Sequence, residues 1–268
     1  MNSPIKNLIP FWLGRKLRGW MQKAKALYYK GDVYYCPFCK HSFRSFLPGG
    51  SDVPVLYEKQ VIGAGYRQND VCPRCYSLDR DRLAYIFLND KTNIFTAPLK
   101  VFHVAPEGCI RALLSSLQNL TYIAGVKYLE GYYYERQTNL LDITKIPYND
   151  EAFDIVICNH VLEHIQDDKL AMRELYRVLK PGGMAILQVP VSKILTTTYE
   201  DPAIILPEER EKAFGQFDHV RIYGQDYQSR LENVGFTVMP YNPYDNKPAE
   251  ELKKFAINPA EKLFVAYK

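Results

Sequence analysis

The chain has 268 residues, of which 47% are hydrophobic and 24% are charged, and its formal net charge is +4. This composition excludes a disordered or fibrous protein and is typical of a globular chain with one substantial domain and a small accessory one. Because the net charge is modest for this length, charge alone does not indicate a nucleic-acid partner.

Residues 1–30 are predicted to form a basic amphipathic helical segment. The segment contains no acidic residue, and apolar residues that include Trp20 recur at three- and four-residue spacing. Its longest apolar run, residues 8–13, is too short for a signal peptide or a membrane span, so we expect a cytoplasmic protein. We expect the helix to dock its apolar face on the protein, the commoner arrangement; the alternatives are peripheral contact with the inner face of the membrane, or nucleic acid.

Four of the six cysteines form two C-x-x-C pairs, Cys36 with Cys39 and Cys72 with Cys75. A two-residue gap in a tight turn directs two thiolates at one ion, and two such turns complete the tetrahedral shell of structural zinc. The 32 residues between the pairs exceed the usual ribbon spacing, so we expect a hairpin-like excursion there. His41 lies close enough to replace a thiolate. The alternative is two unrelated redox pairs; a disulfide scaffold does not suit so long a chain without a secretory signal.

These features predict a zinc-ribbon-like module at residues 31–76 and a linking helix within residues 77–98. Ser77 is the expected N-cap of that helix, and its apolar face is expected to hold Leu83, Ile86 and Phe87. A complete thiolate shell leaves no coordination position for water. Zinc would therefore stabilise the fold rather than take part in catalysis.

Residues 99–268 alternate short apolar runs with helical patterns, which predicts parallel strands covered by helices. The expected helices lie at residues 107–117, 166–183 and 224–236. The expected strands lie at residues 99–105, 120–126, 138–144, 152–159, 184–190, 236–241 and 262–268. Seven strands in this order make an α/β fold with a doubly wound sheet, whose ligand crevice lies at the carboxyl ends of the first strands.

Within residues 142–190, the run D-I-x-x-I-P-Y-x-D-x-x-F-D-x-V is followed by V-L-E-H and then by R-V-L-K-P-G-G. This run resembles the class I S-adenosylmethionine-dependent methyltransferase superfamily, and the resemblance covers residues 99–240. A later block, residues 214–236, is similar to a bacterial subgroup that also carries an N-terminal four-cysteine zinc module. The resemblance implies a Rossmann-like sheet and methyl transfer from S-adenosylmethionine (SAM).

The resemblance also implies roles for residues that follow the strands. Asp142 is expected to bind the adenine amino group, and Ile143 to pack on the adenine ring. Asn159, between Cys158 and His160, is expected to lie beside the methyl group. A turn cap is the alternative role for Asp142, because capping is a common use of aspartate.

The first strand and its loop depart from the family pattern at four cofactor-binding positions. His103 stands where an acid is usual, Ala105 and Glu107 stand at two glycine positions, and Val126 stands where a carboxylate normally binds the ribose. Loss of that contact costs about 1.5 to 3 kcal/mol unless Glu107 or Glu130 compensates. Since the adenine and fourth-strand motifs are intact, we interpret the site as a variant one that still binds SAM.

On the substrate side, His160 and His219 are the candidate catalytic bases, because both titrate near neutral pH. A structural role for either histidine is the alternative. The chain has C-N-H-V where N-P-P-Y would mark methylation of adenine or glutamine nitrogen. We therefore expect oxygen methylation of a small molecule or a glycan. The alternatives are an RNA methyltransferase that grips RNA through the zinc module and the basic N-terminus, and a non-catalytic binding protein with a degenerate cofactor site.

Overall fold

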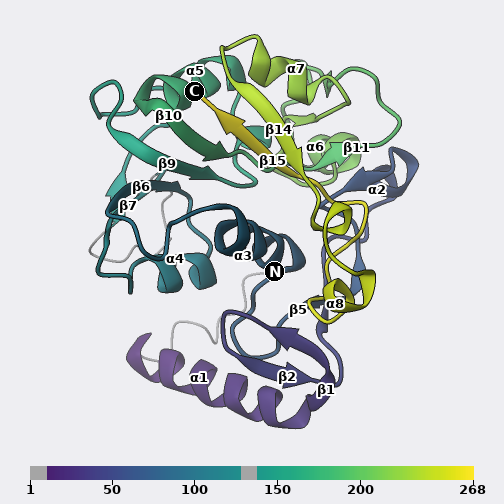
Figure 1. Ribbon diagram of the computed structural model, residues 1–268. Coiled ribbons are helices and arrows are strands. Elements are labelled where there is room, and N and C mark those ends of the chain that lie inside the picture. The colour runs from purple at the N-terminus through teal and green to yellow at the C-terminus, as the bar shows by residue number, and fades with distance from the viewer. Residues whose placement is uncertain (1–10, 128–137) are drawn as a thin grey trace.

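The structure is a computed structural model that describes residues 11–127 and 138–268 (Figure 1). Of the predicted N-terminal helical segment, it describes α1 (Phe11–Tyr28). Residues 1–10 and Glu130, one of the two carboxylates expected to compensate for Val126, lie outside the described residues.

A seven-stranded sheet forms the centre of the fold. In spatial order its strands are β14 (Thr237–Tyr241), β15 (Leu263–Tyr267), β10 (Leu179–Ile186), β9 (Phe153–Cys158), β6 (Leu99–Val104), β7 (Leu120–Val126) and β8 (Thr138–Leu140). Only β15 runs antiparallel to its neighbours. All seven predicted strands are present. The strand order reverses between β6 and β9, so the carboxyl ends of these two strands border the ligand crevice.

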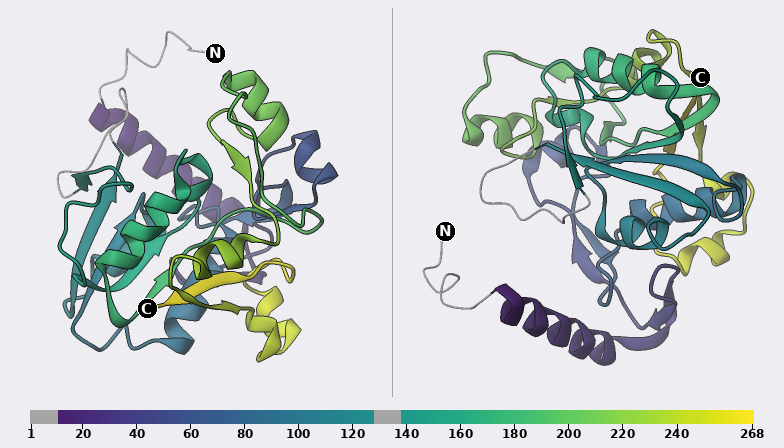
Figure 2. Two further views of the ribbon diagram at one scale, coloured as in Figure 1. Left: turned by 90° about the horizontal axis from the view of Figure 1, so that it is seen from above. Right: turned by 90° about the vertical axis from the view of Figure 1, so that its left-hand side faces the viewer.

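Alternating residues of the strands bury their side chains on opposite faces of the sheet, which produces three layers. Val101 and Ile155 face one apolar cluster, to which α3 (Asp79–Lys91), α4 (Gly108–Leu114) and α8 (Ala249–Lys253) contribute. Their neighbours Phe102 and Val156 face the other cluster, together with α5 (Asp168–Val178) and α7 (Tyr227–Glu232). Figure 2 shows the sheet between these layers. Four short elements in the second half of the chain lie outside this sheet, namely β12 (Tyr199–Glu200), β13 (Arg221–Ile222), η2 (Leu162–His164) and η3 (Pro243–Asp245).

The linking helix α3 buries Leu83, Ile86 and Phe87, as predicted. Its predicted N-cap is wrong. The cap position is Leu78, whose backbone N–H donates to Asp81 Oδ2 at 2.8 Å. The two C-x-x-C turns are here called the first knuckle (Cys36 and Cys39) and the second knuckle (Cys72 and Cys75). Ser77 is instead fully buried, with its hydroxyl 3.3 Å from Cys36 Sγ, because the second knuckle turns the serine toward the sulfur atoms.

The N-terminal module contains two small antiparallel strand pairs. One pairs β1 (Lys30–Cys36) with β2 (His41–Phe43), and the other pairs β3 (Leu47–Gly49) with β5 (Arg67–Val71). Phe43 packs with Cys36 and Cys72 in its core. A core this small gives little stability alone.

The hairpin-like excursion that we expected between the cysteine pairs is present, because β3 and β5 pair antiparallel on either side of residues 50–66, here called the inter-knuckle segment. The segment contains α2 (Pro54–Glu58) and β4 (Val61–Ile62), which extend away from the module toward the later part of the chain. There β4 pairs with β11 (Val191–Ser192), and α2 lies beside α6 (Pro207–Phe214) (Figure 1). The boundaries predicted at residues 76 and 99 therefore separate segments that pack together in space.

Arg82 joins the module to the C-terminal part of the chain from a fully buried position. Its guanidinium donates to the carbonyl oxygens of Ser77 (2.8 Å), Asp70 (2.7 Å) and Phe255 (2.5 Å). The same group lies 4.5 Å from the ring centroid of Phe46. One side chain thus links the second knuckle, β5 and the chain after α8.

The expectation that α1 docks its apolar face on the protein is wrong for the described residues. Contact with the module core comes from Ala26, near the end of the helix, and from Tyr29, which follows it. The apolar side chains that remain exposed are Leu17, Trp20, Met21, Leu27 and Tyr28. Figure 2 shows most of the helix standing away from the body of the protein. No described helix is long and apolar enough to cross a bilayer.

Candidate active site

The loop after β6 makes a tight turn at Ala105, the position where the family pattern has glycine. Ala105 adopts a φ of +45°, in the left-handed region that disfavours residues with a Cβ. Its N–H donates to the carbonyl of Gly125 at 2.7 Å, at the end of the neighbouring strand. The chain therefore keeps the turn without the glycine.

His103 and Glu107 form a pair beneath this loop. The His103 ring is fully buried and bonds the Tyr122 hydroxyl through Nδ1 (3.0 Å) and Glu107 Oε2 through Nε2 (2.9 Å). Burial opposes ionisation of Glu107, but the hydrogen bond and charge interaction with His103, together with smaller contributions such as that of Arg80, lower the pKa of the carboxyl. His103 thus positions an ionised carboxylate four residues further along the chain, rather than reaching a ligand itself.

Asp142 and Ile143 follow β8. Asp142 Oδ1 accepts from the backbone N–H and the hydroxyl of Thr144, both at 2.8 Å, so the carboxylate caps a turn while remaining exposed. These bonds lower its pKa. Ile143 is buried in the core cluster on the α5 face, and Val126 is half-buried at the end of β7. The capping role is therefore present, and the exposed carboxylate remains a candidate for the adenine.

Asn159 and His160 follow β9 directly. Asn159 is buried, and its Oδ1 has no hydrogen-bond partner in the part of the chain that the structure describes. His160 has a φ of +52° and donates its backbone N–H to the carbonyl of Gln188 at 2.7 Å. An unpaired buried oxygen at the end of this strand fits a ligand that supplies a donor.

A cavity of about 370 Å³, here called the histidine cavity, lies between the inter-knuckle segment and the end of β9. His160 and His219, the two predicted bases, both line it, so residues 59 positions apart in sequence come together. The other lining residues are Gly50, Ser51, Leu56, Gly63, Ala64, Arg67, Asp70, Leu78, Arg80, Glu163, His164, Pro190, Gly215 and Gln216. The cavity therefore receives residues from the N-terminal module as well as from the sheet domain.

Glu163, His164 and His219, here called the Glu–His–His cluster, each offer a ligand atom within 4.8 Å of the others. Glu163 is 1% exposed, and among the described residues neither carboxylate oxygen has a hydrogen-bond partner. Its Oε1 approaches His160 Nδ1 to 3.3 Å without hydrogen-bond geometry. Burial raises the pKa of Glu163 to about 8.

One ring of the Glu–His–His cluster has a carboxylate beside it. His164 Nδ1 lies 3.3 Å from Asp218 Oδ2. Burial lowers the pKa of His219 to about 4, with a contribution from His164, and lowers the pKa of His160 as well. The expectation that both rings titrate near neutral pH is therefore wrong, because burial lowers both pKa values, and at neutral pH these two rings are uncharged.

Arg221 holds the 3-10 turn η2 that carries Glu163 and His164. Its guanidinium donates to the carbonyl oxygens of Leu162 (3.0 Å) and Gln166 (2.9 Å). The N–H of Val220 donates to the carbonyl of Glu163 at 2.9 Å. The sequence motifs L-E-H and D-H-V-R are therefore packed against each other, a pairing that spacing alone did not predict.

Two further residues near the cavity were missed by the sequence analysis. Arg80 lines the cavity from the start of α3, and within residues 11–127 and 138–268 its buried Nε has no hydrogen-bond partner. Glu261 is fully buried under the tip of the inter-knuckle segment and accepts from Gln188 at 3.1 Å. Burial, with Asp79 nearby, raises its pKa to about 8. The available signal for Arg80 was its place in S-L-D-R-D-R, directly after the second knuckle.

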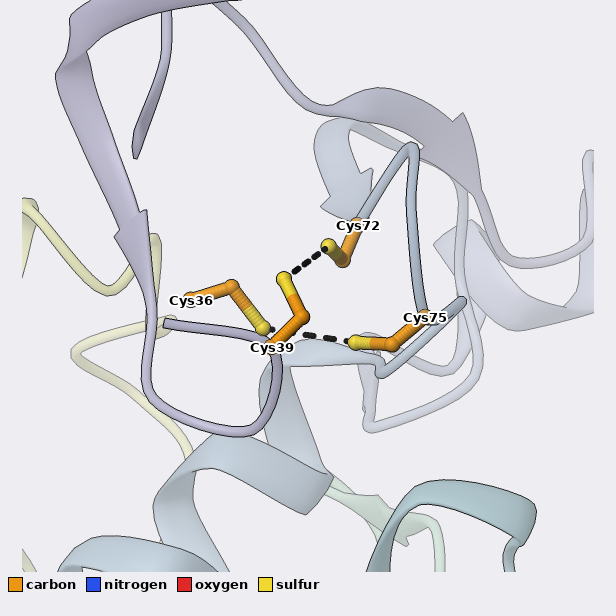
Figure 3. Close-up of side chains that lie close together, drawn as sticks. All are labelled: Cys36, Cys39, Cys72 and Cys75. Atoms are coloured by element: carbon orange, nitrogen blue, oxygen red, sulfur yellow. Dashed lines mark hydrogen bonds between the residues drawn. The ribbon is translucent and has the colours of Figure 1, made fainter. Parts of the chain in front are cut away.

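The four predicted metal ligands converge in the module (Figure 3). Cys36 Sγ lies 3.4 Å from Cys75 Sγ, and Cys39 Sγ lies 3.7 Å from Cys72 Sγ. A tetrahedron with Zn–S bonds of 2.3 Å has edges of about 3.8 Å, so these separations fit a single zinc ion, whereas a disulfide needs about 2.05 Å. The neighbouring thiols of the cluster lower the pKa of Cys36.

Comparison with known proteins adds a family match over part of the chain. Residues 125–187 match the family described as "Methyltransferase domain". The demethylmenaquinone methyltransferase of Streptomyces griseus is 48% identical over 46 residues, 17% of this chain and 20% of that protein. That of Mycobacterium marinum is 35% identical over 63 residues, 22% and 27% of the two chains. The chain thus spans about a fifth to a quarter of the length of these relatives.

A solved structure of a 1,6-didemethyltoxoflavin-N1-methyltransferase from Burkholderia thailandensis superimposes with a TM-score of 0.47 at 12% identity, covering 71% of this chain and 77% of that one. Over residues 125–187 the chain is thus similar to methyltransferase domains, and its strand order is that of a Rossmann-like α/β fold. The family match does not include the cysteines at 36–75, so the four-cysteine subgroup remains a prediction.

Proposed function

We propose that this protein transfers the methyl group of SAM to a hydroxyl oxygen of a small molecule or glycan held in the histidine cavity. The observation that carries the proposal is the position of His160. It directly follows β9, at the edge where the cofactor crevice of this fold lies, and it also lines the cavity. A base at this junction can reach both a methyl donor and an acceptor.

The described residues fit SAM at three strand ends. Glu107 would hold the ribose hydroxyls or the methionine ammonium, Asp142 the adenine amino group, and Asn159 a donor that satisfies its unpaired Oδ1. Arg80 would pair with a carboxylate, such as that of the methionine moiety. When bound, SAM supplies an electrophilic methyl group on a sulfonium, and the protein's part is to orient the acceptor and remove its proton.

His160 is the proposed base, because its ring is neutral at physiological pH and lies in the cavity. We expect His160→Gln to lower kcat by about 10²- to 10⁴-fold with little change in SAM affinity. The assay offers hydroxylated metabolites and oligosaccharides with labelled SAM, and calorimetry measures SAM affinity. A variant with full activity would overturn the assignment of His160.

The same experiments separate the rival functions. Absence of SAM binding at millimolar ligand would favour a non-catalytic binding protein. Methylation of RNA, with affinity that falls steeply as salt rises, would favour an RNA methyltransferase. The modest net charge of +4 supports the small-molecule or glycan acceptor instead.

We also propose that the four-cysteine cluster holds one structural zinc ion. The support is the separation of its sulfur atoms and the burial of Cys36 and Cys72, which leaves no route for a substrate to a closed shell. Metal analysis of the purified protein should find at least one zinc per chain. Absence of zinc, with four titratable thiols, would contradict this role.

The exposed face of α1 favours a second property, peripheral attachment to an anionic membrane surface. Trp20 is 77% exposed and Leu27 is 74% exposed, and no acidic residue lies among the first thirty. Such a helix lies in the membrane interface with its apolar side buried. Vesicles with anionic lipid should retain the wild type and release a Trp20→Glu/Leu27→Glu variant. Ile205→Glu, at an exposed apolar position elsewhere, is the matched control and should bind like the wild type.

A further inference from the structure

The histidine cavity contains three potential metal ligands that the proposed methyl transfer does not require as a set. These are the members of the Glu–His–His cluster, which come from the turn η2 and from the loop before β13. One carboxylate and two imidazoles are a ligand set that suits Mn²⁺, Fe²⁺, Co²⁺ and Zn²⁺. We propose that Glu163, His164 and His219 bind a divalent first-row transition-metal ion inside the histidine cavity.

The first support is the state of Glu163. Its side chain is 2% exposed, and among the described residues no group donates a hydrogen bond to either oxygen. A buried carboxylate without donors is costly, and a protonated carboxyl would still lack an acceptor for its O–H. A cation bound between Glu163 and the two rings satisfies this group without any change of fold.

The second support is the set of contacts behind the ligands. Metal-binding histidines usually donate their other ring N–H to a carboxylate or a backbone carbonyl, which fixes the ring. His164 has Asp218 in this position. Asp218 is itself held by Gln216 Nε2 at 2.7 Å. Arg221 fixes the backbone of the turn that carries the first two ligands.

Three protein ligands leave coordination positions for water or for an acceptor hydroxyl. This part of the inference rests on the proposed function. An ion here would orient an acceptor oxygen beside His160 and lower the pKa of its hydroxyl. His219 would then be a ligand, and His160 would remain as the base.

The test uses full-length protein that carries one equivalent of zinc and has been freed of excess metal, because excess zinc would fill the Glu–His–His cluster ahead of Mn²⁺. Mn²⁺ is then added in steps and monitored by electron paramagnetic resonance. Mn²⁺ prefers oxygen and imidazole ligands, so it distinguishes this cluster from the four thiols. We expect one bound Mn²⁺ per chain. Glu163→Gln and His219→Gln should each weaken binding by about 100-fold or more, and Asp218→Asn by about 10- to 100-fold. Glu211→Gln, on the exposed side of α6, is the matched control and should bind like the wild type.

Glu163→Gln is not expected to unfold the protein, because the amide has the shape of the carboxyl and replaces a group that has no hydrogen-bond partner among the described residues. Without metal its melting temperature should equal or exceed that of the wild type, and added Mn²⁺ should raise the melting temperature of the wild type alone. The inference is overturned if Mn²⁺, Co²⁺ and Zn²⁺ bind only at the four thiols, or if Glu163→Gln leaves Mn²⁺ binding intact. In that case movement of the Arg80 side chain toward Glu163 would supply the missing hydrogen-bond donor of the carboxylate.

These measurements need neither SAM nor an acceptor. Methyl transfer by a protein that binds no second metal would refute this inference and leave the proposed function standing. Binding of a second metal by a protein that does not bind SAM would support this inference and refute the proposed function.

Discussion

The cofactor edge of the sheet and the histidine cavity are built in different ways. The cofactor edge comes from the ends of neighbouring strands, where pairing of β6 with β7 and β9 sets the positions of Ala105 and Asn159. The histidine cavity is lined by residues from distant parts of the chain, namely residues 50–80, 160–164, 190 and 215–219. The sheet alone therefore determines the positions of the residues at the cofactor edge, whereas the histidine cavity also depends on the N-terminal module.

The largest effect that tests this difference should come from Cys72→Ser. Loss of one ligand should lower the zinc content below one per chain and reduce the free energy of unfolding by more than about 3 kcal/mol, because the binding energy of structural zinc is folding energy. Chemical denaturation and metal analysis measure both quantities. Methylation of an acceptor should fall further than SAM affinity does.

Cys109→Ser is the matched control, since Cys109 lies outside the four-cysteine cluster, and it should keep one zinc per chain. If Cys72→Ser instead lowered SAM affinity and acceptor methylation equally, the cofactor edge would depend on the N-terminal module as much as the histidine cavity does. That result would contradict the prediction.

A second prediction concerns pH and the contact between the inter-knuckle segment and the C-terminal part of the chain. Glu261 has a pKa of about 8 when folded and about 4.5 when exposed, so the folded chain keeps a proton that the unfolded chain releases. Stability is therefore lost as the pH rises through this range. Glu261→Gln should remove that loss, with a gain of up to about 4 kcal/mol at pH 8.5 and under about 1 kcal/mol at pH 5.

Unfolding by urea at the two pH values measures this effect. Asp154→Asn is the control that should not depend on pH in this range. Burial opposes ionisation of Asp154, but its bonds to Lys180 and to the N–H of Lys100 together lower its pKa below the usual 3.8, so its contribution is lost only at lower pH and the variant should behave alike at pH 5 and pH 8.5. Equal gains from Glu261→Gln at both pH values would contradict the prediction.

A third prediction tests the cofactor edge at Asp142. Asp142→Ala should weaken SAM binding by about 10- to 100-fold, corresponding to the 1.5 to 3 kcal/mol of a hydrogen bond to a charged group. Calorimetry with SAM measures the change. Thr144→Val removes a partner of the turn but keeps the carboxylate, so it should leave SAM affinity unchanged. A similar loss in both variants would mean that Asp142 acts only as a turn cap.

The smallest effect is expected at Ala105. Replacement by glycine relieves the left-handed backbone but adds freedom to the unfolded chain, two terms of about 1 kcal/mol each with opposite signs. Ala105→Gly should therefore change stability by less than about 1 kcal/mol and keep SAM binding. Denaturation and calorimetry measure both. A clear loss of SAM affinity would show that the Cβ of Ala105 contributes to the site.

The strands and the four-cysteine cluster were predictable from the sequence because each depends on local patterns. Alternation of apolar residues located all seven strands, and the C-x-x-C spacing located four thiols that the structure brings within one coordination sphere. The family motifs also placed His160 at the end of β9.

The cavity was less predictable because it depends on long-range packing. His219 was singled out for its polar neighbours, but its approach to Glu163 results from Arg221 binding the carbonyls around η2. The pairing of β4 with β11 could not be predicted from residue periodicity, because β4 has only two residues. The exposed face of α1 was also missed, because amphipathic spacing shows that a helix has an apolar side but not what covers it.

Arg82 has a consequence for any attempt to divide the chain. A fragment beginning at residue 99 would lose this guanidinium and leave the carbonyl of Phe255 without its donor. It would also lose β4 beside β11 and the α2 side chains that pack on Phe214. The part that resembles an ordinary methyltransferase would thus expose an unpaired strand edge and an apolar surface, and we expect it to aggregate when expressed alone.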